Sequence, residues 1–313
     1  MTNNLQQSSQ PTFGNKTCIV IAGPTAVGKT SFAIQLAQQL NTQIISADSR
    51  QCFKELNIGV AKPSPEQLQQ VKHYFINSHS VSDEVNAVVF EQYALQKVNE
   101  IFAQHNTAVM VGGTGLYIKA FSNGIDAVPA VDIAIREKII ADYELQGLEW
   151  LQTEVQKNDS AYFTKGEIKN PQRLMRALEV KLSSGQSILD FQTQQKKQRD
   201  FNIIKLGLEL PKEELYKNIN SRVDEMIVQG LTKEVEALYQ YKNLNALQTV
   251  GYKELFDYAD GVIPLEKAVE QIKLNTRHYA KRQMTWFKKD VEMKWVSPHL
   301  PVSAVLEEIS LGK

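Results

Sequence analysis

Hydrophobic positions along the chain follow two different periods. Short runs rich in β-branched residues predict buried parallel strands, and they lie at 18–22, 42–47, 107–111 and 201–210. Segments in which apolar residues recur every three or four positions predict helices, and they include 31–40, 131–143, 145–156, 171–182 and a long segment after Pro211. Strands and helices alternate from 16 to 124. This alternation predicts an α/β fold, a parallel sheet with helices on both faces.

The alternation stops near Pro129. From 131 to 200 the chain shows helical patterns without a convincing strand, which predicts a helical insertion domain. The remaining parts, 16–130 and 201–313, are expected to form the sheet domain and its C-terminal helices. Residues 1–15 are polar and rich in Gln, Asn and Ser, so we expect a disordered tail there.

A phosphate-binding loop follows the first predicted strand. The sequence GPTAVGKT at 23–30 matches G-x-x-x-x-G-K-[ST] between a strand and a helix. Backbone N–H groups and the helix N-terminus of such a loop attract phosphate. Lys29 adds a positive charge, and the Thr30 hydroxyl is placed to bind Mg²⁺. The sequence therefore predicts a P-loop NTPase-like sheet that binds a phosphorylated compound.

The next two strands end in different chemistry. Asp48 follows the second strand, at the sheet edge where ligands of open α/β folds bind; it is a candidate base or Mg²⁺ ligand, or an ordinary turn residue. The third strand ends in Gly112 and Gly113, without the acid that P-loop hydrolases carry there. These glycines predict close approach of a ligand or a plain tight turn. The chain thus lacks part of the equipment for ATP hydrolysis.

Composition limits the remaining choices. The 313 residues carry 35 basic and 35 acidic side chains, a formal net charge of zero, which argues against a wholly electrostatic nucleic-acid binder but permits local basic patches. Cys18 and Cys52 are the two cysteines, too few for a disulfide framework. The sequence has neither a membrane-length apolar run nor a signal peptide. We therefore expect a cytoplasmic protein.

Two segments combine basic residues with features suited to RNA. The predicted helix at 171–182 carries Arg173 and Arg176, and the segment 276–289 alternates basic and aromatic residues. Basic side chains suit phosphates, and flat rings suit unstacked bases. The alternative for the second segment is a solvated helix face with Trp286 and Phe287 in the core.

Seven stretches, in this order and spacing, resemble the tRNA dimethylallyltransferases, enzymes that prenylate the adenosine 3′ of the anticodon. They are GPTAVGKT (23–30), ISADSRQCF (45–53), IGVAKP (58–63), VGGTGLY (111–117), NPQRLMRALEV (170–180), VGYKEL (250–255) and KRQMTWF (281–287). The resemblance covers about residues 17 to 289. It implies transfer of a dimethylallyl group from dimethylallyl diphosphate to N6 of that adenosine, with release of diphosphate.

The resemblance also implies roles for individual residues. Asp48 corresponds to the proposed base, Thr114 to a residue near the reaction channel, and Lys29 and Arg222 to groups that contact the diphosphate. The donor cradle corresponds to Gly23, Pro24, Thr25, Ala26, Val27, Gly28, Lys29 and Thr30, with Mg²⁺ as cofactor at Thr30. Contacts to the anticodon stem-loop of tRNA correspond to Asp48, Ser49, Arg50, Gln51, Thr114, Gln172, Arg173, Leu174, Met175, Arg176, Gly251, Tyr252, Lys281, Arg282, Gln283 and Trp286. We expect a monomer.

Three alternatives compete with this interpretation. A small-molecule P-loop kinase shares the loop and the acid, but would use ATP. An adenylate isopentenyltransferase would prenylate a free nucleotide, for which the insertion and the basic C-terminal helix are unnecessary. An RNA-binding module with an inactive site is disfavoured by the intact Lys29, Thr30 and Asp48.

Overall fold

A computed structural model describes residues 15–193 and 195–310. The predicted tail, 1–15, lies outside the described residues except for Asn15. The chain forms two compact units. We call residues up to Asn123 and from Gln198 onward the sheet unit, and Gly124–Lys197 the helical unit.

The sheet unit contains a parallel sheet of six strands in the order β3-β2-β4-β1-β5-β6. The predicted fold class, a P-loop NTPase-like parallel sheet with helices, is confirmed. The predicted strands correspond to β1, β2, β4 and β5, whereas the short edge strands β3 and β6 were not predicted. The strands are β1 (Thr17–Ala22), β2 (Ile44–Ser46), β3 (His73–Tyr74), β4 (Thr107–Gly112), β5 (Asn202–Leu208) and β6 (Met293–Val296).

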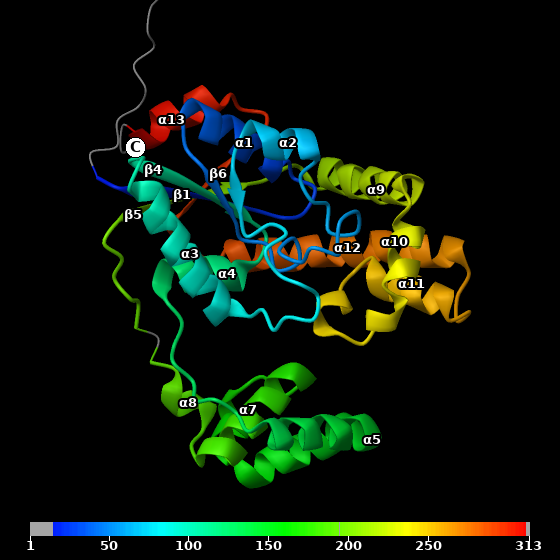
Figure 1. Ribbon diagram of the computed structural model, residues 1–313. Coiled ribbons are helices and arrows are strands. Elements are labelled where there is room, and N and C mark those ends of the chain that lie inside the picture. The colour runs from blue at the N-terminus through cyan, green and yellow to red at the C-terminus, as the bar shows by residue number, and fades with distance from the viewer. Residues whose placement is uncertain (1–14, 194, 311–313) are drawn as a thin grey trace, which may run out of the picture. The chain divides into compact units, whose positions relative to one another are not determined.

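Helices cover both faces of this sheet; Figure 1 shows α1 and α13 on one side and α3 and α4 on the other. Among the described residues no helix is both long and apolar enough to cross a membrane. The helices of the sheet unit are α1 (Lys29–Gln39), α2 (Pro65–Gln70), α3 (Ala87–Phe102), α4 (Gly115–Asn123), α9 (Lys212–Gln229), α10 (Leu231–Ala237), α11 (Tyr252–Ala259), α12 (Leu265–Phe287) and α13 (Val302–Ser310). Short 3₁₀ turns lie at Tyr239–Tyr241 and Asn245–Leu247.

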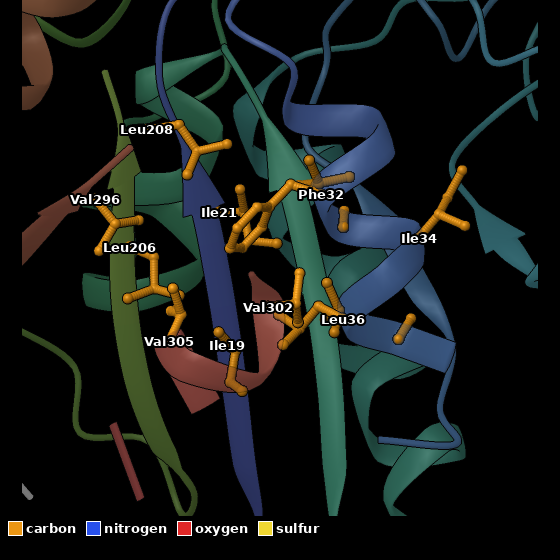
Figure 2. Packing of buried hydrophobic residues seen from close by; sticks show 14 of the residues in the cluster. Ile19, Ile21, Phe32, Ile34, Leu36, Leu206, Leu208, Val296, Val302 and Val305 are labelled. Atoms are coloured by element: carbon orange, nitrogen blue, oxygen red, sulfur yellow. The ribbon is translucent and has the colours of Figure 1, made fainter. Parts of the chain in front are cut away.

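The core of the sheet unit explains why β1 reads as an unbroken apolar run. All six residues of this central strand are buried, because helices pack on both of its faces. Ile19 and Ile21 share one face of the strand and join a cluster with Phe32 and Leu36 of α1 and Val302 of α13 (Figure 2). This packing fixes the end of β1, and with it the start of the phosphate loop.

The helical unit has its own small core. It consists of α5 (Ile133–Asn158), α6 (Ser160–Lys165), α7 (Pro171–Ser184) and α8 (Ile188–Phe191). The two helices predicted at 131–143 and 145–156 form α5, which is kinked at Gly147 (φ 77°). Pro171 occupies the first turn of α7, where its missing N–H costs nothing. Whether the insertion has the predicted limits, 131–200, and binds tRNA stays a prediction.

Candidate active site

A cavity of about 840 Å³ opens at the carboxyl ends of the strands of the sheet unit. The phosphate loop, the segment after β2 and the turn after β4 line it, together with residues of α9 and α12. The carboxyl edge is where open parallel sheets bind ligands. Its lining includes Thr25, Ala26, Gly28, Lys29, Thr30, Asp48, Ser49, Arg50, Gln51, Gly113, Arg222, Gly251, Arg282 and Gln283.

The phosphate loop is shaped by glycines. Gly23 has φ 148°, and a Cβ there would lie 2.7 Å from the carbonyl oxygen of Leu208. Gly28 has φ 96° at the N-cap of α1, a conformation that glycine adopts without strain. Lys29 begins the helix, so the first N–H groups of α1 are free of helical partners and point toward the cavity side of the loop. The loop therefore has the backbone geometry of an anion-binding cradle.

Lys29 is enclosed by the cradle. Its Nζ donates a hydrogen bond to the carbonyl oxygen of Pro24 at 2.6 Å. Burial is the main cause that lowers the pKa of Lys29 to about 7; the negative charge of Asp48 acts to raise this pKa, and the positive charge of Arg222 acts to lower it. A nearby anion would act in the opposite direction and favour the charged amine.

Asp48 occupies a turn and lines the cavity at the same time. Its Oδ1 accepts hydrogen bonds from the backbone N–H groups of Arg50 (2.9 Å) and Gln51 (3.2 Å). This is the turn arrangement considered as an alternative in the sequence. Within the described residues the hydrogen bonds of Asp48 fall on Oδ1, so Oδ2 is available to a ligand. The hydrogen bonds of the turn therefore orient the carboxylate through Oδ1 and leave Oδ2 without a protein partner among the described residues.

Thr114 lies beside this turn because β4 neighbours β2 in the sheet. The Thr114 hydroxyl accepts from Ser49 N–H at 3.0 Å and donates to Ser49 Oγ at 3.3 Å. The Thr114 N–H donates to the carbonyl oxygen of Ala47 at 3.2 Å. Two loops that are 65 residues apart in sequence are thus joined at the acid. Asp48 and Thr114, which the resemblance named separately as site residues, are thus brought close together.

Arg222 reaches the cavity from α9. Its Nη1 lies 3.5 Å from the Thr25 hydroxyl of the phosphate loop. Burial lowers its pKa from the ordinary arginine value, yet a guanidinium stays charged at neutral pH. A second positive group therefore faces the cradle beside Lys29.

The residues predicted to contact tRNA have different environments. Lys281, Arg282 and Trp286 are exposed on α12, whereas Gln283 between them is buried. Trp286 packs closely on Gly115, where a Cβ would lie 2.2 Å from the indole ring. Trp286 is therefore not in the core, although its ring packs on Gly115, whereas the ring of Phe287 is buried. Contact of this helix with tRNA stays a prediction.

In the helical unit the predicted stretch divides in the same way. Gln172 and Arg173 are exposed and Arg176 is half-exposed, while Leu174 and Met175 lie in the core. Leu174 and Met175 therefore stabilise the helical unit by packing in its core, because neighbouring residues of an amphipathic helix face different sides. The tRNA-contacting surface predicted for α7 is therefore restricted to Gln172, Arg173 and Arg176.

Two further predicted contacts serve the sheet unit internally. The Tyr252 side chain is fully buried, and its hydroxyl donates to Glu234 at 2.6 Å. Gln51 Nε2 donates to the carbonyl oxygens of Val60 and Ala61 at 3.2 and 3.1 Å. The Tyr252 and Gln51 side chains therefore stabilise the walls of the cavity. Gln51, and Gly251 immediately before Tyr252, also line the cavity.

Glu234 was missed in the sequence. Its carboxylate accepts from the N–H groups of Ile58 (2.8 Å) and Gly59 (3.1 Å), as well as from Tyr252. A Cβ at Gly59 would lie 2.5 Å from the Tyr252 ring, so the segment that contains IGVAKP is held tightly against α10 and α11. A glutamate on a polar helix gives no local signal of this role, because its backbone partners, Ile58 and Gly59, are about 176 residues away.

A phosphate loop after the first strand, two positive groups beside it and an acid on the next strand define a P-loop-type enzyme that acts on a phosphorylated substrate. The IPP transferase family model matches residues 51–290. The chain belongs to the IPP transferase family, and the predicted family and enzyme class, a prenyltransferase, are confirmed.

Individual relatives extend the match over the phosphate loop. The chain is similar to the tRNA dimethylallyltransferase of Cytophaga hutchinsonii, with 46% identity over 91% of this chain and 94% of the relative. It is 48% identical to that of Christiangramia forsetii, over 88% of this chain and 92% of the relative. The structure resembles the tRNA isopentenylpyrophosphate transferase of Bacillus halodurans, with a TM-score of 0.69 and 32% identity over 95% of each chain.

A eukaryotic dimethylallyltransferase acting on tRNA has a TM-score of 0.75 to this structure. The identity is 27%, over 90% of this chain and 74% of that chain. The sheet and its surrounding helices are therefore shared with a protein of considerably different sequence.

Proposed function

We propose that this protein transfers the dimethylallyl group of dimethylallyl diphosphate to N6 of the adenosine 3′-adjacent to the tRNA anticodon, releasing diphosphate. The single observation that carries the proposal is the cavity itself. The anion cradle with Lys29 and the acid Asp48 line one space of about 840 Å³, and Thr114 is hydrogen-bonded to Ser49 in its wall. A leaving group and an acceptor are thereby given places in the same chamber.

The leaving group is diphosphate. When N6 attacks the allylic C1, the C1–O bond breaks and its electron pair leaves with the diphosphate. Negative charge grows on the leaving oxygen, and groups already in place to meet it lower the barrier. The N–H groups of the phosphate loop, Lys29 and Arg222 are these groups. Enclosure of the cradle strengthens each of these electrostatic interactions.

The nucleophile needs a proton acceptor. The N6 lone pair is delocalised into the adenine ring, so the amine becomes nucleophilic only as it loses a proton. Asp48 Oδ2 takes that proton, while Oδ1 stays hydrogen-bonded to its own turn. Thr114 holds the adjacent segment through Ser49 and so keeps the acid at the acceptor side of the cavity.

Mg²⁺ fits this chamber as a proposed cofactor. Among the described residues no cluster of three or more His, Cys, Asp or Glu side chains forms a metal site, but Mg²⁺ commonly binds through substrate phosphates with one or two protein oxygens. The Thr30 hydroxyl lines this cavity and would hold the ion together with the diphosphate. Bound there, the ion would neutralise charge on the diphosphate.

The tRNA side of the proposal rests on exposed basic residues. Lys281 and Arg282 on α12 are suited to phosphates of the anticodon stem-loop, as are Gln172, Arg173 and Arg176 on α7. The target adenosine must leave its stack to enter the chamber. The protein acts as a monomer in the cytoplasm, where tRNA and the donor are both found.

The test compares acceptors and donors under one condition. The protein is incubated with Mg²⁺ and dimethylallyl diphosphate plus either tRNA or AMP, and nucleosides are analysed by mass spectrometry. We expect one dimethylallyl group on adenosine of tRNA and none on AMP. Prenylated AMP would favour the adenylate isopentenyltransferase. Consumption of ATP without a prenyl donor would favour a kinase, and either result would overturn the proposal.

A further inference from the structure

Gln283 of α12 connects the two sides of the cavity. Its side chain is 6% exposed. Oε1 accepts from the backbone N–H of Thr25 in the phosphate loop at 2.9 Å. Nε2 donates to the carbonyl oxygen of Gly113, after β4, also at 2.9 Å. One buried amide therefore bridges the loops that follow β1 and β4.

The chemistry of the two partners selects an amide. A backbone N–H only donates and a carbonyl only accepts, so the bridging side chain needs an acceptor and a donor on one short end. Gln offers both. A carboxylate would satisfy Thr25 alone, and an ammonium would satisfy Gly113 alone. An alternative residue would leave a buried backbone group unpaired, which costs free energy.

Gly113 gives independent support. A Cβ at this position would lie 2.3 Å from Gln283 Nε2. The φ of Gly113 is outside the left-handed range, so the backbone conformation does not by itself require glycine. Glycine is favoured at this position because a Cβ would displace the Gln283 amide. The sequence predicted that this glycine admits a ligand or forms a tight turn; in the structure it admits a protein side chain.

Each end of the bridge adjoins a group of the proposed reaction. Thr25 is the hydroxyl residue near Arg222 on the diphosphate side. Gly113 precedes Thr114, which holds the Asp48 segment through Ser49. The bridge thus spans from donor to acceptor, and a change in its length would alter the spacing between C1 of the donor and N6.

We propose that Gln283 is a positioning residue whose amide sets the spacing between the diphosphate cradle and the acceptor-side turn. This inference rests on the proposed function for its catalytic consequence. It replaces the direct tRNA contact that the resemblance implied for Gln283, because the side chain is buried and both of its polar ends are used. The neighbours Lys281 and Arg282 keep that outward role.

The test is a double-mutant cycle of Gln283→Ala and Gly113→Ala, with Thr285→Ala on the exposed face of α12 as control. The single-turnover rate at saturating donor and tRNA should fall about tenfold to a hundredfold in each single variant, since small misplacements of reacting groups have effects of this size. The tRNA dissociation constant should stay within about twofold of wild type, and Thr285→Ala should resemble wild type in both measurements.

The double variant discriminates most sharply. If Gly113→Ala acts by displacing the amide, it does no further harm once Gln283 is shortened, so the double variant should match Gln283→Ala. Additive reductions in rate would contradict the inference. So would weaker tRNA binding with an unchanged saturated rate, which would restore the direct contact. Thermal unfolding of every variant separates these results from a failure to fold, and Gln283→Glu, which keeps the acceptor but loses the donor, should be slowed as well.

Failure of the proposed function is distinguishable. Affinity for inorganic diphosphate, measured by calorimetry on the same variants, requires neither tRNA nor transfer. A loosened cradle should bind diphosphate several-fold more weakly, again without additivity in the double variant. If the wild type fails to prenylate tRNA but the variants show non-additive effects on diphosphate affinity, the proposed function is wrong and the positioning role of Gln283 is supported. Additive effects on diphosphate affinity would sink the bridge.

Discussion

The cavity of the sheet unit and the surface of the helical unit use polar residues in opposite ways. Around the cavity, the side chains of Asp48, Thr114 and Gln283 each form hydrogen bonds to backbone N–H groups. The partners of Asp48 lie in its own turn, whereas those of Thr114 and Gln283 lie in segments distant in sequence. On α7, Gln172 and Arg173 extend from an exposed helix face. Transfer between two substrates needs atoms held within fractions of an ångström. Binding of an RNA backbone tolerates long, adaptable side chains.

This difference has an energetic side. The polar groups of the cavity are supported by a large core that fixes the strand ends, whereas the helical unit buries a much smaller set of residues. Its Arg176, whose side chain is 41% exposed, lies 3.6 Å from the buried carboxylate of Glu179. Substitutions at the cavity should therefore change rate, and substitutions on α7 should change affinity.

The largest effect is expected for Asp48→Asn. Asn keeps an oxygen for the two turn N–H groups but cannot take the N6 proton, so single-turnover transfer should fall by about a hundredfold to ten-thousandfold. Asp83→Asn is the matched control, since Asp83 caps an exposed turn at Ser80 N–H. Rescue of Asp48→Asn by high Mg²⁺ would indicate a metal ligand instead, and a near-wild-type, pH-independent rate would rule out the base.

Lys29→Ala should follow, with a reduction of about two to three orders of magnitude in transfer rate, because it removes a positive charge from the leaving group. Lys97→Ala, at a surface ion pair with Glu100, should leave the rate unchanged. Both are measured with saturating tRNA. A folded Lys29→Ala protein with wild-type turnover would contradict the proposal that the phosphate loop binds the diphosphate.

Arg173→Ala combined with Arg176→Ala tests the exposed surface. We expect weaker tRNA binding, with the slope of log affinity against log salt reduced by about one for each RNA phosphate that the variant no longer neutralises. Affinity for the donor should be unchanged. Lys138→Ala with Lys157→Ala, on α5 of the same unit, controls for charge alone. Equal binding by the double arginine variant and wild type across a salt series would show that α7 does not bind the RNA.

The smallest effect concerns pH. The pKa of Lys29 is lowered to about 7 by burial, and bound diphosphate should raise it, so binding takes up a proton above pH 7. Affinity for diphosphate should therefore weaken as pH rises from about 7, and change less below it. Calorimetry at pH 8 in buffers of different ionisation enthalpy measures the uptake. Lys29→Arg, always charged, should abolish it; the same uptake in that variant would assign the proton elsewhere.

Much of the fold was readable because its signals are local. The phosphate loop at 23–30 marks the strand before it and the helix after it, and the four predicted strands β1, β2, β4 and β5 each lie within an apolar run of the sequence. The strands β3 and β6 escaped prediction because they lie at the sheet edges, where both residues of β3 and the middle two of β6 are only partly buried and show no continuous apolar run. The break in α5 at Gly147 falls inside the second of the two helices expected there, 145–156, so the predicted boundary near residue 144 was misplaced.

The sequence by itself determined the family, the phosphate cradle and the acid that follows the second strand, because motif and strand lie side by side along the chain. The tertiary structure alone decided that Gln283 and Tyr252 face inward, that Glu234 fastens Ile58 and Gly59, and that Gly113 makes room for an amide. These contacts join residues more than a hundred positions apart or depend on which side of a helix faces the core. Packing, and not local pattern, chooses between the two faces.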